Sequence, residues 1–486
     1  MKRVADIIKN IANLAIEGVI DLEISGLSLD SRTVKENYLY AAIVGTQTDG
    51  HQYIDQAIEN GATVILCNNK YVQNKTATYL ITADVSKTLG LLAANYYDNP
   101  SNQLEVVAIT GTNGKTTCAS ILYELFTEMG YHCGLLSTVA IRIGQKTLNA
   151  SHTTPNAIAI QETMALMVKE GCTYCFMEAS SHAIHQQRIS GLKIAIAGFT
   201  NLSHDHLDYH HTFAEYRDAK KILFDQLPSE AFAISNKDDK NGVIMLQNTK
   251  ASKFYYSLKQ PADFKGKIIE MDIEGMLLNI NEQEAWYRLT GGFNASNLLL
   301  VYGIAFLLGK MGEEIITSLS KVGRVAGRFE TIKSISGITG IIDYAHTPDA
   351  LLNLLITVNS IRTKNEKLYL IFGCGGNRDK TKRPEMGNIA AKNSDKVIIT
   401  SDNPRNENEE DIIEDILKGV EPTDFKKIIT ISKRDQAIKT AVAMAEKGDI
   451  IIIAGKGHEQ YQEINGLKHP FDDASFLKKA FKELEK

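Results

Sequence analysis

The stretch Ala-Ile-Thr-Gly-Thr-Asn-Gly-Lys-Thr-Thr, residues 108–117, constrains the fold of this chain more than any other. The apolar run 106–109 leads into it and is typical of a buried strand. The apolar residues of 118–129 follow it at helical spacing. A strand, a glycine-bearing turn and a helix N-terminus direct several backbone N–H groups to one point, and that arrangement binds phosphate. The segment therefore predicts a phosphate-binding loop within an α/β sheet.

The residue types of this loop indicate ATP as the ligand. Lys115 would supply charge to the outer phosphates, and the hydroxyl of Thr116 would ligate Mg²⁺. The pattern Gly-x-x-Gly-Lys-Thr is shorter than the general P-loop, because Ile109 stands where that pattern has a further glycine. An ordinary helix-start loop with a surface lysine is the alternative. The expected nucleotide-binding residues of the loop are Gly111, Thr112, Asn113, Gly114, Lys115, Thr116 and Thr117.

Length and composition limit the class of protein. A chain of 486 residues suggests about three domains of ~100–200 residues each. The net charge of -5 gives no reason to expect nucleic-acid binding, and no run reaches the ~18 apolar residues that span a membrane. Residues 1–17 resemble an amphipathic helix and not a signal peptide. Scattered cysteines, including a C-x-x-C pair interpreted as structural, predict a reduced, cytoplasmic protein, which we expect to be a monomer.

Hydrophobic periodicity predicts an α/β fold with three domains. Residues 1–99 mix short strands and helices in a small α/β domain. After a polar turn at 99–102, residues 100–328 alternate strands with helices, which indicates a parallel sheet around the P-loop. Residues 329–486 repeat the alternation and predict a C-terminal Rossmann-like domain.

Polar residues follow the predicted strands of the central sheet, where parallel α/β sheets form their sites. Glu178 ends one strand and is a candidate Mg²⁺ ligand, with a helix-capping or salt-bridged glutamate as the alternative. The window 204–211 is rich in histidine and aspartate, including His206. A structural zinc site is an alternative there, although no cysteine joins it. By periodicity alone, Lys220 is a solvated lysine on the amphipathic helix 213–227.

Nine motifs spread over nearly the whole chain resemble the Mur ligases, which are ATP-dependent amino-acid ligases that assemble the peptide of the bacterial cell-wall precursor. Each motif is weak alone, and their order and spacing carry the resemblance. They are Asp30-Ser-Arg32, Gly111-Thr-Asn-Gly-Lys-Thr-Thr117, His152-Thr-Thr-Pro155, Glu178-Ala-Ser-Ser-His182, His204-Asp-His-Leu-Asp208, Gly292-Phe-Asn-Ala-Ser-Asn297, Gly327-Arg-Phe-Glu330, Asp343-Tyr-Ala-His-Thr-Pro348 and Asp402-Asn-Pro-Arg405.

The resemblance implies roles that the residue patterns alone do not. Lys220 would be carbamylated by CO₂, which reverses the surface prediction, and would hold Mg²⁺ together with Thr116, Glu178 and His206. Arg328 would contact the γ-phosphate. The adenine would lie near Asn294 and Asn297, and the ribose near Asp343. The implied catalytic residues are Lys115, Glu178, His206, Lys220 and Arg328.

The resemblance also implies the muramyl substrate, a UDP-muramyl-dipeptide. Ser28, Asp30 and Ser31 would face its uridine diphosphate. A second set of residues would cradle the muramyl-peptide. This set comprises Thr153, Thr154, Ser180, Gln186 and Arg188.

The pattern Thr-Thr-Pro followed by Glu-Ala-Ser-Ser-His-x-x-x-Gln-x-Arg resembles the branch that adds the third residue of the stem peptide, lysine or meso-diaminopimelate. Arg405 favours diaminopimelate, because a guanidinium grips a second carboxylate with two hydrogen bonds. Arg378 would bind the other carboxylate, and Gly455 with Glu459 the distal ammonium. The alternative pairs Arg405 with Glu407 or Glu409. The discriminating loop is Asp402, Asn403, Pro404 and Arg405.

The expected reaction passes through an acyl phosphate that the incoming amine displaces. The alternatives are a ligase that adds lysine, a folylpolyglutamate-type synthetase and a P-loop switch or motor ATPase. A folylpolyglutamate-type enzyme should lack the Asp30-Ser-Arg domain that binds a uridine nucleotide. A switch ATPase would hydrolyse ATP without any amine.

Overall fold

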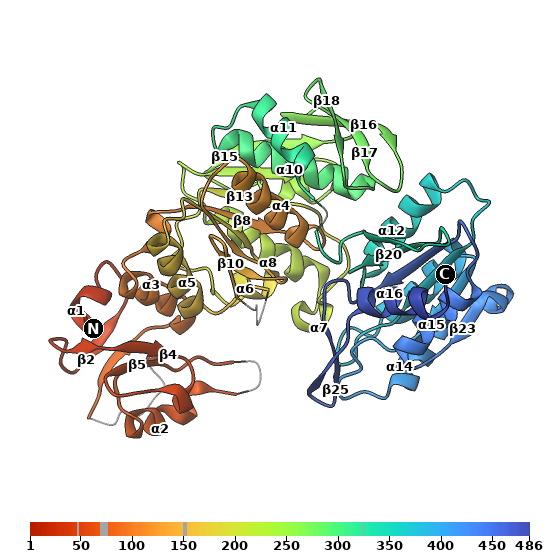
Figure 1. Ribbon diagram of the computed structural model, residues 1–486. Helices are drawn as coiled ribbons and strands as arrows, with labels where there is room; N and C mark the ends of the chain where they lie inside the picture. Colours follow the sequence, from red (N-terminus) through yellow and green to blue (C-terminus); the bar gives the residue numbers. More distant parts are fainter. Residues whose placement is uncertain (46–47, 69–75, 149–152, 324) are drawn as a thin grey trace.

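The computed structural model describes residues 1–45, 48–68, 76–148, 153–323 and 325–486. Three α/β units follow one another along the chain and form an arc (Figure 1), with the N-terminal unit at the lower left and the C-terminal unit at the right. The predicted α/β class with three domains is confirmed. The limits near residues 99 and 328 stay a prediction. Nowhere in the described part does a helix combine the length and apolar character that a membrane span requires.

The N-terminal unit is built on a five-stranded sheet of order β2-β7-β6-β5-β4, in which β2 alone is antiparallel to its neighbour. The strands are β2 (Ala15–Glu17), β4 (Gly26–Ser28), β5 (Tyr38–Ala41), β6 (Ala62–Cys67) and β7 (Thr78–Ile81), with helices α2 (Ile54–Glu59) and α3 (Val85–Tyr96).

The helix expected over residues 1–17 is wrong. Strand β1 (Lys2–Arg3) and helix α1 (Val4–Ile7) form instead, before β2. Asn10 and Asn13 adopt left-handed backbone angles of 62° and 57°, which a continuing right-handed helix excludes.

The central unit contains an eleven-stranded sheet of order β11-β10-β9-β12-β8-β13-β14-β15-β16-β17-β18. The strands from β9 to β16 in this order pair in parallel, as predicted, while hairpins add antiparallel strands at both edges. The parallel strands are β8 (Glu105–Thr110), β9 (Cys133–Leu136), β12 (Tyr174–Glu178), β13 (Ile196–Phe199), β14 (Phe232–Asn236), β15 (Ser252–Ser257) and β16 (Phe264–Met271). The edge strands are β10 (Ile141–Ile143), β11 (Lys146–Leu148), β17 (Met276–Ile280) and β18 (Gln283–Tyr287).

Helices cover both faces of this sheet, so its central strands are buried on both sides. In β8, Val107 and Ile109 join one core with helices α4, α10 and α11, whereas Val106 and Ala108 join the other with α5 and α8. This is why the strand reads as a continuous apolar run and not as an alternating one. The helices are α4 (Lys115–Glu128), α5 (Ala157–Lys169), α8 (Phe213–Asp225), α10 (Gly292–Leu307) and α11 (Gly312–Lys321).

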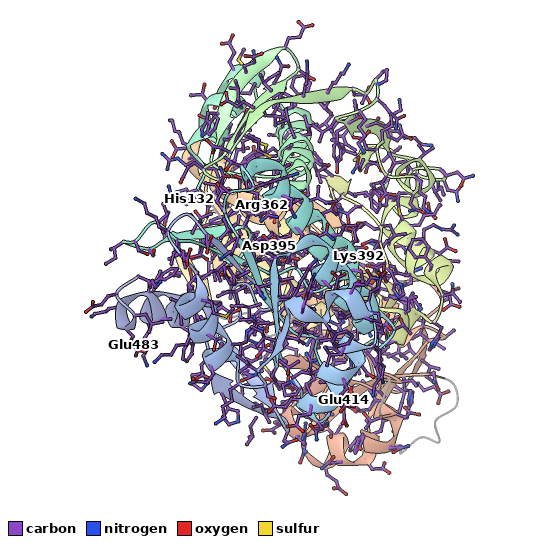
Figure 2. All side chains as sticks on the ribbon, turned by 90° about the vertical axis from the view of Figure 1, so that its right-hand side faces the viewer. His132, Arg362, Lys392, Asp395, Glu414 and Glu483 are labelled. Atoms are coloured by element: carbon purple, nitrogen blue, oxygen red, sulfur yellow. The ribbon has the colours of Figure 1, made fainter. Side chains whose placement is uncertain are left out.

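The C-terminal unit is a six-stranded sheet of order β19-β20-β24-β21-β22-β23, parallel except for β19. Helices α12, α13 and α14 cover one face, and α15 and α16 cover the other. Figure 2 turns this unit toward the viewer. The strands are β19 (Glu330–Lys333), β20 (Thr339–Asp343), β21 (Leu368–Phe372), β22 (Lys396–Ile399), β23 (Ile428–Thr430) and β24 (Ile450–Ala454). The helices are α12 (Pro348–Ile361), α13 (Lys382–Asn393), α14 (Glu409–Leu417), α15 (Arg434–Met444) and α16 (Asp473–Glu483).

The N-terminal unit docks on the central unit through a close approach of two glycines. Helix α3 packs against α5. A Cβ at Gly90 of α3 would lie 2.5 Å from the carbonyl oxygen of Ser190, and a Cβ at Gly191 would lie 2.6 Å from the carbonyl oxygen of Gly90. Backbone therefore touches backbone here, which fixes the position of the first unit.

We predict that Gly90→Leu lowers the free energy of unfolding by about 1–3 kcal/mol, because a side chain in this contact must separate the two backbones. Denaturant unfolding measures the change, and faster proteolysis between the first two units should accompany it. Gly292→Leu is the control, because no atom lies within 4 Å of a Cβ at that position. Equal stabilities of the two variants would contradict the prediction.

Candidate active site

The P-loop joins β8 to α4 and depends on two glycines. Gly111 has a φ of +148°, and a Cβ there would lie 1.8 Å from Oγ1 of Thr200. Gly114 has a φ of +86°, and a Cβ there would lie 2.5 Å from Oδ1 of Asn297. A side chain at either position would displace the loop, so the spacing of the two glycines is a steric requirement.

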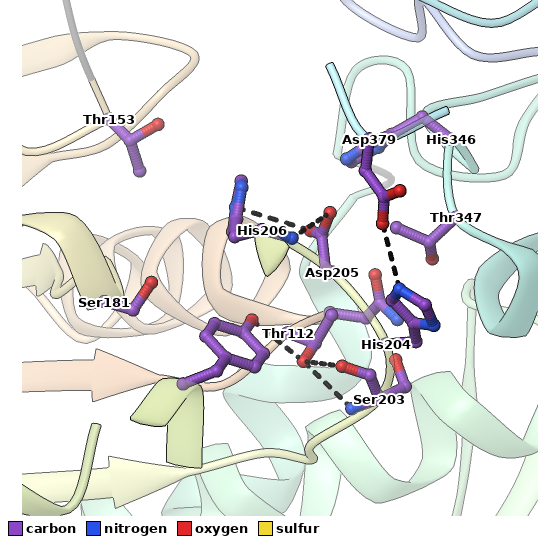
Figure 3. Close-up of polar contacts among 12 residues, drawn as sticks. Thr112, Thr153, Ser181, Ser203, His204, Asp205, His206, His346, Thr347 and Asp379 are labelled. Atoms are coloured by element: carbon purple, nitrogen blue, oxygen red, sulfur yellow. Dashed lines mark hydrogen bonds and ion pairs between the residues drawn. The ribbon is translucent and has the colours of Figure 1, made fainter. Parts of the chain in front are cut away.

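The segment that follows β13 holds this loop in place. The backbone N–H of Asn113 donates to Oδ1 of Asn201 at 3.0 Å, and Oγ1 of Thr200 donates to the carbonyl of Asn113 at 2.6 Å. The N–H of Ser203 donates to Oγ1 of Thr112 at 3.0 Å (Figure 3). No role was predicted for these three anchoring residues, Thr200, Asn201 and Ser203. Their position directly after a strand of the same sheet is the signal that could have identified them.

Lys115 folds back onto its own loop. Its Nζ donates to the carbonyls of Gly111 at 2.9 Å and Thr112 at 2.7 Å. Desolvation lowers the pKa of Lys115, while the carboxylates of Glu178 and Asp205 oppose the shift. A bound phosphate would supply the anionic partner that this ammonium lacks.

Glu178, Thr116 and Arg328 meet beside the loop. Glu178 lies at the end of β12 with 1% of its surface exposed. Its Oε2 accepts from Oγ1 of Thr116 at 2.9 Å, and its Oε1 accepts from the N–H of Thr138 at 2.7 Å. Nη2 of Arg328 donates to the same Thr116 hydroxyl at 3.2 Å. The structure thus brings the predicted carboxylate and arginine to the first turn of α4.

Lys220 is buried, and the surface position predicted from periodicity is wrong. Only 1% of the residue is exposed, and its Nζ donates to the carbonyl of Gly111 at 2.8 Å. The ammonium also lies 4.5 Å from the ring centroid of Tyr216. Burial lowers the pKa of Lys220 well below its ordinary value, and the charge of Lys115 adds to the effect. Position 220 lies one helical turn from Tyr216 and from Leu223, both buried, so α8 turns Lys220 toward the core.

His206 lies close to the P-loop and contacts Asp205 and Tyr216. It has a left-handed φ of 55°, and its Nε2 lies 3.4 Å from Oδ2 of Asp205 (Figure 3). Its ring centroid lies 6.1 Å from that of Tyr216, whose hydroxyl is 3.1 Å from Oγ1 of Thr112. Burial lowers the pKa of His206 to about 3, although Asp205 opposes the shift, so the imidazole is neutral at physiological pH.

The metal donors are not assembled as a cluster of standard ligands. Among the described side chains, no group of three or more His, Cys, Asp and Glu is arranged to hold a metal ion. The predicted Mg²⁺ set differs, because it includes the hydroxyl of Thr116 and a carbamate on Lys220, which only chemical modification would create.

The candidate nucleoside residues surround the loop from two units. On α10, Nδ2 of Asn294 donates to the carbonyl of Thr290 at 2.8 Å, and Nδ2 of Asn297 donates to Oδ1 of Asn294 at 3.3 Å. At the end of β20, the oxygens of Asp343 accept from the N–H groups of Phe329 and Ala345, each at 2.8 Å. Burial raises the pKa of Asp343, and Arg328 opposes the shift.

The predicted muramyl-peptide cradle forms one hydrogen-bonded group. Oγ1 of Thr154 donates to the carbonyl of Glu178 at 2.8 Å, and the N–H of Ser180 donates back to that hydroxyl at 3.2 Å. Arg188 donates to the carbonyl of Thr154 at 2.8 Å and to Oε1 of Gln186 at 2.6 Å. Tyr209 was not predicted, and its hydroxyl accepts from Nε2 of Gln186 at 3.0 Å.

Thr153 is the remaining residue of the predicted cradle, and the predicted uridine diphosphate residues lie in the N-terminal unit. Thr153 accepts from Oγ1 of Thr138 at 3.0 Å, whereas His152 of the same motif lies outside the described residues. In the N-terminal unit, Oγ of Ser28 donates to the carbonyl of Asp30 at 2.9 Å, and Ser31 donates to Oε1 of Gln56 at 2.8 Å.

The loops after β22 and β24 meet in a cluster of hydrogen-bonded polar side chains in the C-terminal unit, which we call the polar pocket. Nδ2 of Asn403 donates to Oε2 of Glu459 at 2.8 Å, and Nζ of Lys456 donates to Oδ1 of Asn403 at 3.0 Å. A Cβ at Gly455 would lie 2.6 Å from Oδ2 of Asp402, so the two loops touch. Burial raises the pKa of Glu459, and Asp402 raises it further. The buried Lys456, which was not predicted, supplies the compensating charge.

Arg405 lies beside this pocket and does not pair with the nearby Glu407. Its Nη1 donates to the carbonyl of Gly376 at 2.7 Å, and its Nε lies 3.3 Å from Oε2 of Glu463. Glu407 instead pairs with the buried Arg383 at 3.0 Å. Pairing of Arg405 with Glu407 is therefore wrong. Arg378, which was predicted to bind the other carboxylate of diaminopimelate, lies exposed on the adjoining loop.

Contacts between the central and C-terminal units bring the pocket toward the P-loop. Nε2 of His204 lies 2.9 Å from Oδ2 of Asp379, the residue after Arg378 (Figure 3). Nδ2 of Asn113 donates to Oδ2 of Asp349 at 3.3 Å. The P-loop therefore touches α12 directly, and the loop that bears Arg378 faces the site.

A P-loop that faces the polar loops of a second α/β unit suits an ATP-dependent enzyme with a further substrate on that unit. Three parts of the chain match profiles of one family. Residues 23–97 match the catalytic domain of the Mur ligase family, 109–305 the Mur ligase middle domain, and 327–457 the Mur ligase glutamate ligase domain. The chain belongs to the Mur ligase family.

Two relatives with similar sequences are named for the same activity. A UDP-N-acetylmuramoyl-L-alanyl-D-glutamate–2,6-diaminopimelate ligase of Bacteroides fragilis is 49% identical over 480 residues, 99% of each chain. The ligase of the same name from Bacteroides thetaiotaomicron is 50% identical over 477 residues, 98% of this chain and 99% of its own. A solved structure of a ligase of that name covers both chains fully at 31% identity with a TM-score of 0.70. MurF from Acinetobacter baumannii, at 16% identity and a TM-score of 0.66 over 100% of this chain and 99% of its own, shares the fold.

Proposed function

We propose that the chain joins meso-diaminopimelate to the glutamate of UDP-N-acetylmuramoyl-L-alanyl-D-glutamate at the expense of ATP. The names of relatives about 50% identical over nearly the full length support this proposal. The observation that carries it in this chain is Arg405 beside a pocket with Glu459 and Asn403. A guanidinium suits the distal carboxylate that lysine lacks, and Glu459 suits the distal ammonium.

In the first step the glutamate carboxylate attacks the γ-phosphate of ATP and forms an acyl phosphate and ADP. Two anions must approach each other, which costs about 4 kcal/mol per charge pair at ~4 Å and an effective dielectric near 20. The Lys115 ammonium lies against the loop carbonyl of Gly111, and the Arg328 guanidinium lies against the Thr116 hydroxyl in the first turn of α4. Both would offset the repulsion and stabilise the charge that develops in transfer.

The residues present fit Mg²⁺. The Thr116 hydroxyl and a Glu178 oxygen lie 2.9 Å apart, so two hard oxygen donors already share one location. His206 and a carbamate on Lys220 would complete the set, and the bound ion would neutralise phosphate charge.

In the second step the neutral amine attacks the acyl carbon, the amide bond forms, and phosphate and a proton leave. The pocket residues would hold the distal end of diaminopimelate, Arg405 and Arg378 at its carboxylates and Glu459 at its ammonium. Holding that end orients the reacting amine toward the acyl phosphate.

The surroundings of Lys220 favour its carbamylation. The neutral amine attacks CO₂, and a carbamate anion forms with release of a proton. Burial lowers the pKa of Lys220, so a larger fraction of the amine is neutral than on an exposed lysine. The nearby Lys115 would then face an anion instead of a second cation.

A phosphate-release assay with each substrate omitted in turn tests the proposed function. We expect release of phosphate only when ATP, the muramyl dipeptide and diaminopimelate are all present, because the dipeptide carboxylate accepts the phosphoryl group and the amine then displaces phosphate from the acyl phosphate. With lysine in place of diaminopimelate we expect little turnover. Phosphate release from ATP alone would indicate a switch ATPase, and equal turnover with lysine would indicate the alternative ligase.

We predict that Arg405→Ala lowers activity with diaminopimelate at least ~100-fold, because a carboxylate would remain unpaired in a polar site. Steady-state kcat/KM with diaminopimelate measures the loss. Arg405→Lys should retain part of the activity, since it keeps the charge but loses the bidentate fork. The control is Lys392→Ala on the same unit, an exposed lysine paired with Glu421. Unchanged diaminopimelate kinetics in Arg405→Ala would overturn the assignment.

Carbamylation of Lys220 should give one carbamate carbon resonance when the protein is equilibrated with ¹³C-bicarbonate. We expect the signal to disappear in Lys220→Ala, together with most ligase activity. Lys221→Ala is the matched control, because the next lysine pairs with Asp225 at 2.6 Å. A signal that persists in Lys220→Ala, or is absent from the unsubstituted protein, would refute the modification.

A further inference from the structure

A fully buried ion pair lies beneath the polar pocket of the C-terminal unit. Nε and Nη2 of Arg434 donate to the two carboxylate oxygens of Asp473, each at 2.8 Å. Both side chains have an exposed fraction of 0%. The pair joins the first residue of α15 to the first residue of α16 on the face of the sheet that carries these helices.

The guanidinium also binds two carbonyls that precede the pocket loops. Nη2 donates to the carbonyl of Ala454 at 3.0 Å, and Nη1 to the carbonyl of Ser401 at 3.5 Å. The next residues are Gly455 and Asp402. Strand β21 separates β24 from β22, so these carbonyls belong to strands about 9–10 Å apart. Arg434 therefore spans the carboxyl edge of the sheet below the pocket.

Local preferences do not favour an arginine here. A cation at the first position of a helix opposes the helix dipole, whereas Asp473 at the start of α16 agrees with it. Buried ion pairs also contribute little net stability compared with apolar residues of similar volume. A residue that breaks a local rule and is fully compensated points to a requirement other than stability.

The electrostatics connect the pair to the pocket above it. Burial lowers the pKa of Arg434, but the carboxylate of Asp473 more than offsets this, and the carboxylates of Asp402 and Glu459 raise the pKa further. The loops touch where Asp402 meets Gly455, so a shift in either carbonyl would move the pocket wall. Gln462 adds a second support, because its Nε2 donates to the carbonyl of Asp402 at 2.7 Å.

We propose that Arg434 and Asp473 are positioning residues that set the separation of the two loops binding the distal end of the amino-acid substrate. The inference rests on the proposed function of this pocket. Arg434 holds the loop of Asp402–Arg405 and the loop of Gly455–Glu459 at the distance that fits a carbon bearing both a carboxylate and an ammonium. Asp473 orients the guanidinium and neutralises it.

The test replaces the ion pair without leaving a buried charge. In the double variant Arg434→Met with Asp473→Leu, we expect the KM for diaminopimelate to rise at least ~10-fold, while the KM values for ATP and the muramyl dipeptide change less than ~2-fold. Arg434→Lys keeps the charge but cannot span both carbonyls, and we expect an intermediate rise. A purely structural role would lower the melting temperature or the active fraction and leave the KM for diaminopimelate unchanged.

Arg362→Met is the matched control. Arg362 forms an ion pair with Asp395 at the opposite edge of the same sheet, before β21 and β22 (Figure 2). It should affect stability without raising the KM for diaminopimelate. A folded double variant with unchanged KM for diaminopimelate, or an equal rise in Arg362→Met, would overturn the inference. If the unsubstituted protein does not use diaminopimelate, the proposed function itself fails, and the two failures are thereby distinguished.

Discussion

The anchoring of the P-loop to the segment after β13 is the interaction on which the rest of the site depends. The backbone of the loop is fixed by Thr200, Asn201 and Ser203, and Lys220 on α8 donates to the carbonyl of Gly111. The segment then continues into His206. The end of β13 therefore positions the phosphate cradle and one candidate metal donor, His206, together.

Charge balance explains why so many ionisable groups can share this region. Lys115 and Lys220 are both desolvated, which lowers the pKa of each, and the neutral His206 adds no charge. Glu178 and Asp205 supply the nearby negative charge. Conversion of Lys220 to a carbamate would turn one cation into an anion and create the donor that the described His, Cys, Asp and Glu side chains do not provide.

Sequence reasoning succeeded where packing and local pattern agree. Both cover layers of the central sheet bury β8, so its unbroken apolar run identified the strand before the P-loop, and β12 ends at Glu178 as expected. It failed where an unusual backbone conformation or a distant contact determines the structure. The left-handed Asn10 ended the N-terminal helix early, and Lys220 is buried because α8 lies against a loop more than a hundred residues earlier in the chain.

The polar pocket shows why the remaining residues escaped detection. Lys456 and Arg434 carry charges that look solvated in sequence, yet both side chains are 0% exposed and each pairs with a carboxylate, Glu459 or Asp473. Asp473 lies on another helix than Arg434, and Asn403, which accepts from Lys456, lies on another loop, so spacing along the chain carries no sign of these two contacts. Recognition of a substrate with charges at its far end requires fixed countercharges, and buried cations below the loops hold those countercharges in place. If these loops bind the amino acid as proposed, substrate choice in this unit would depend on residues that the substrate itself does not touch.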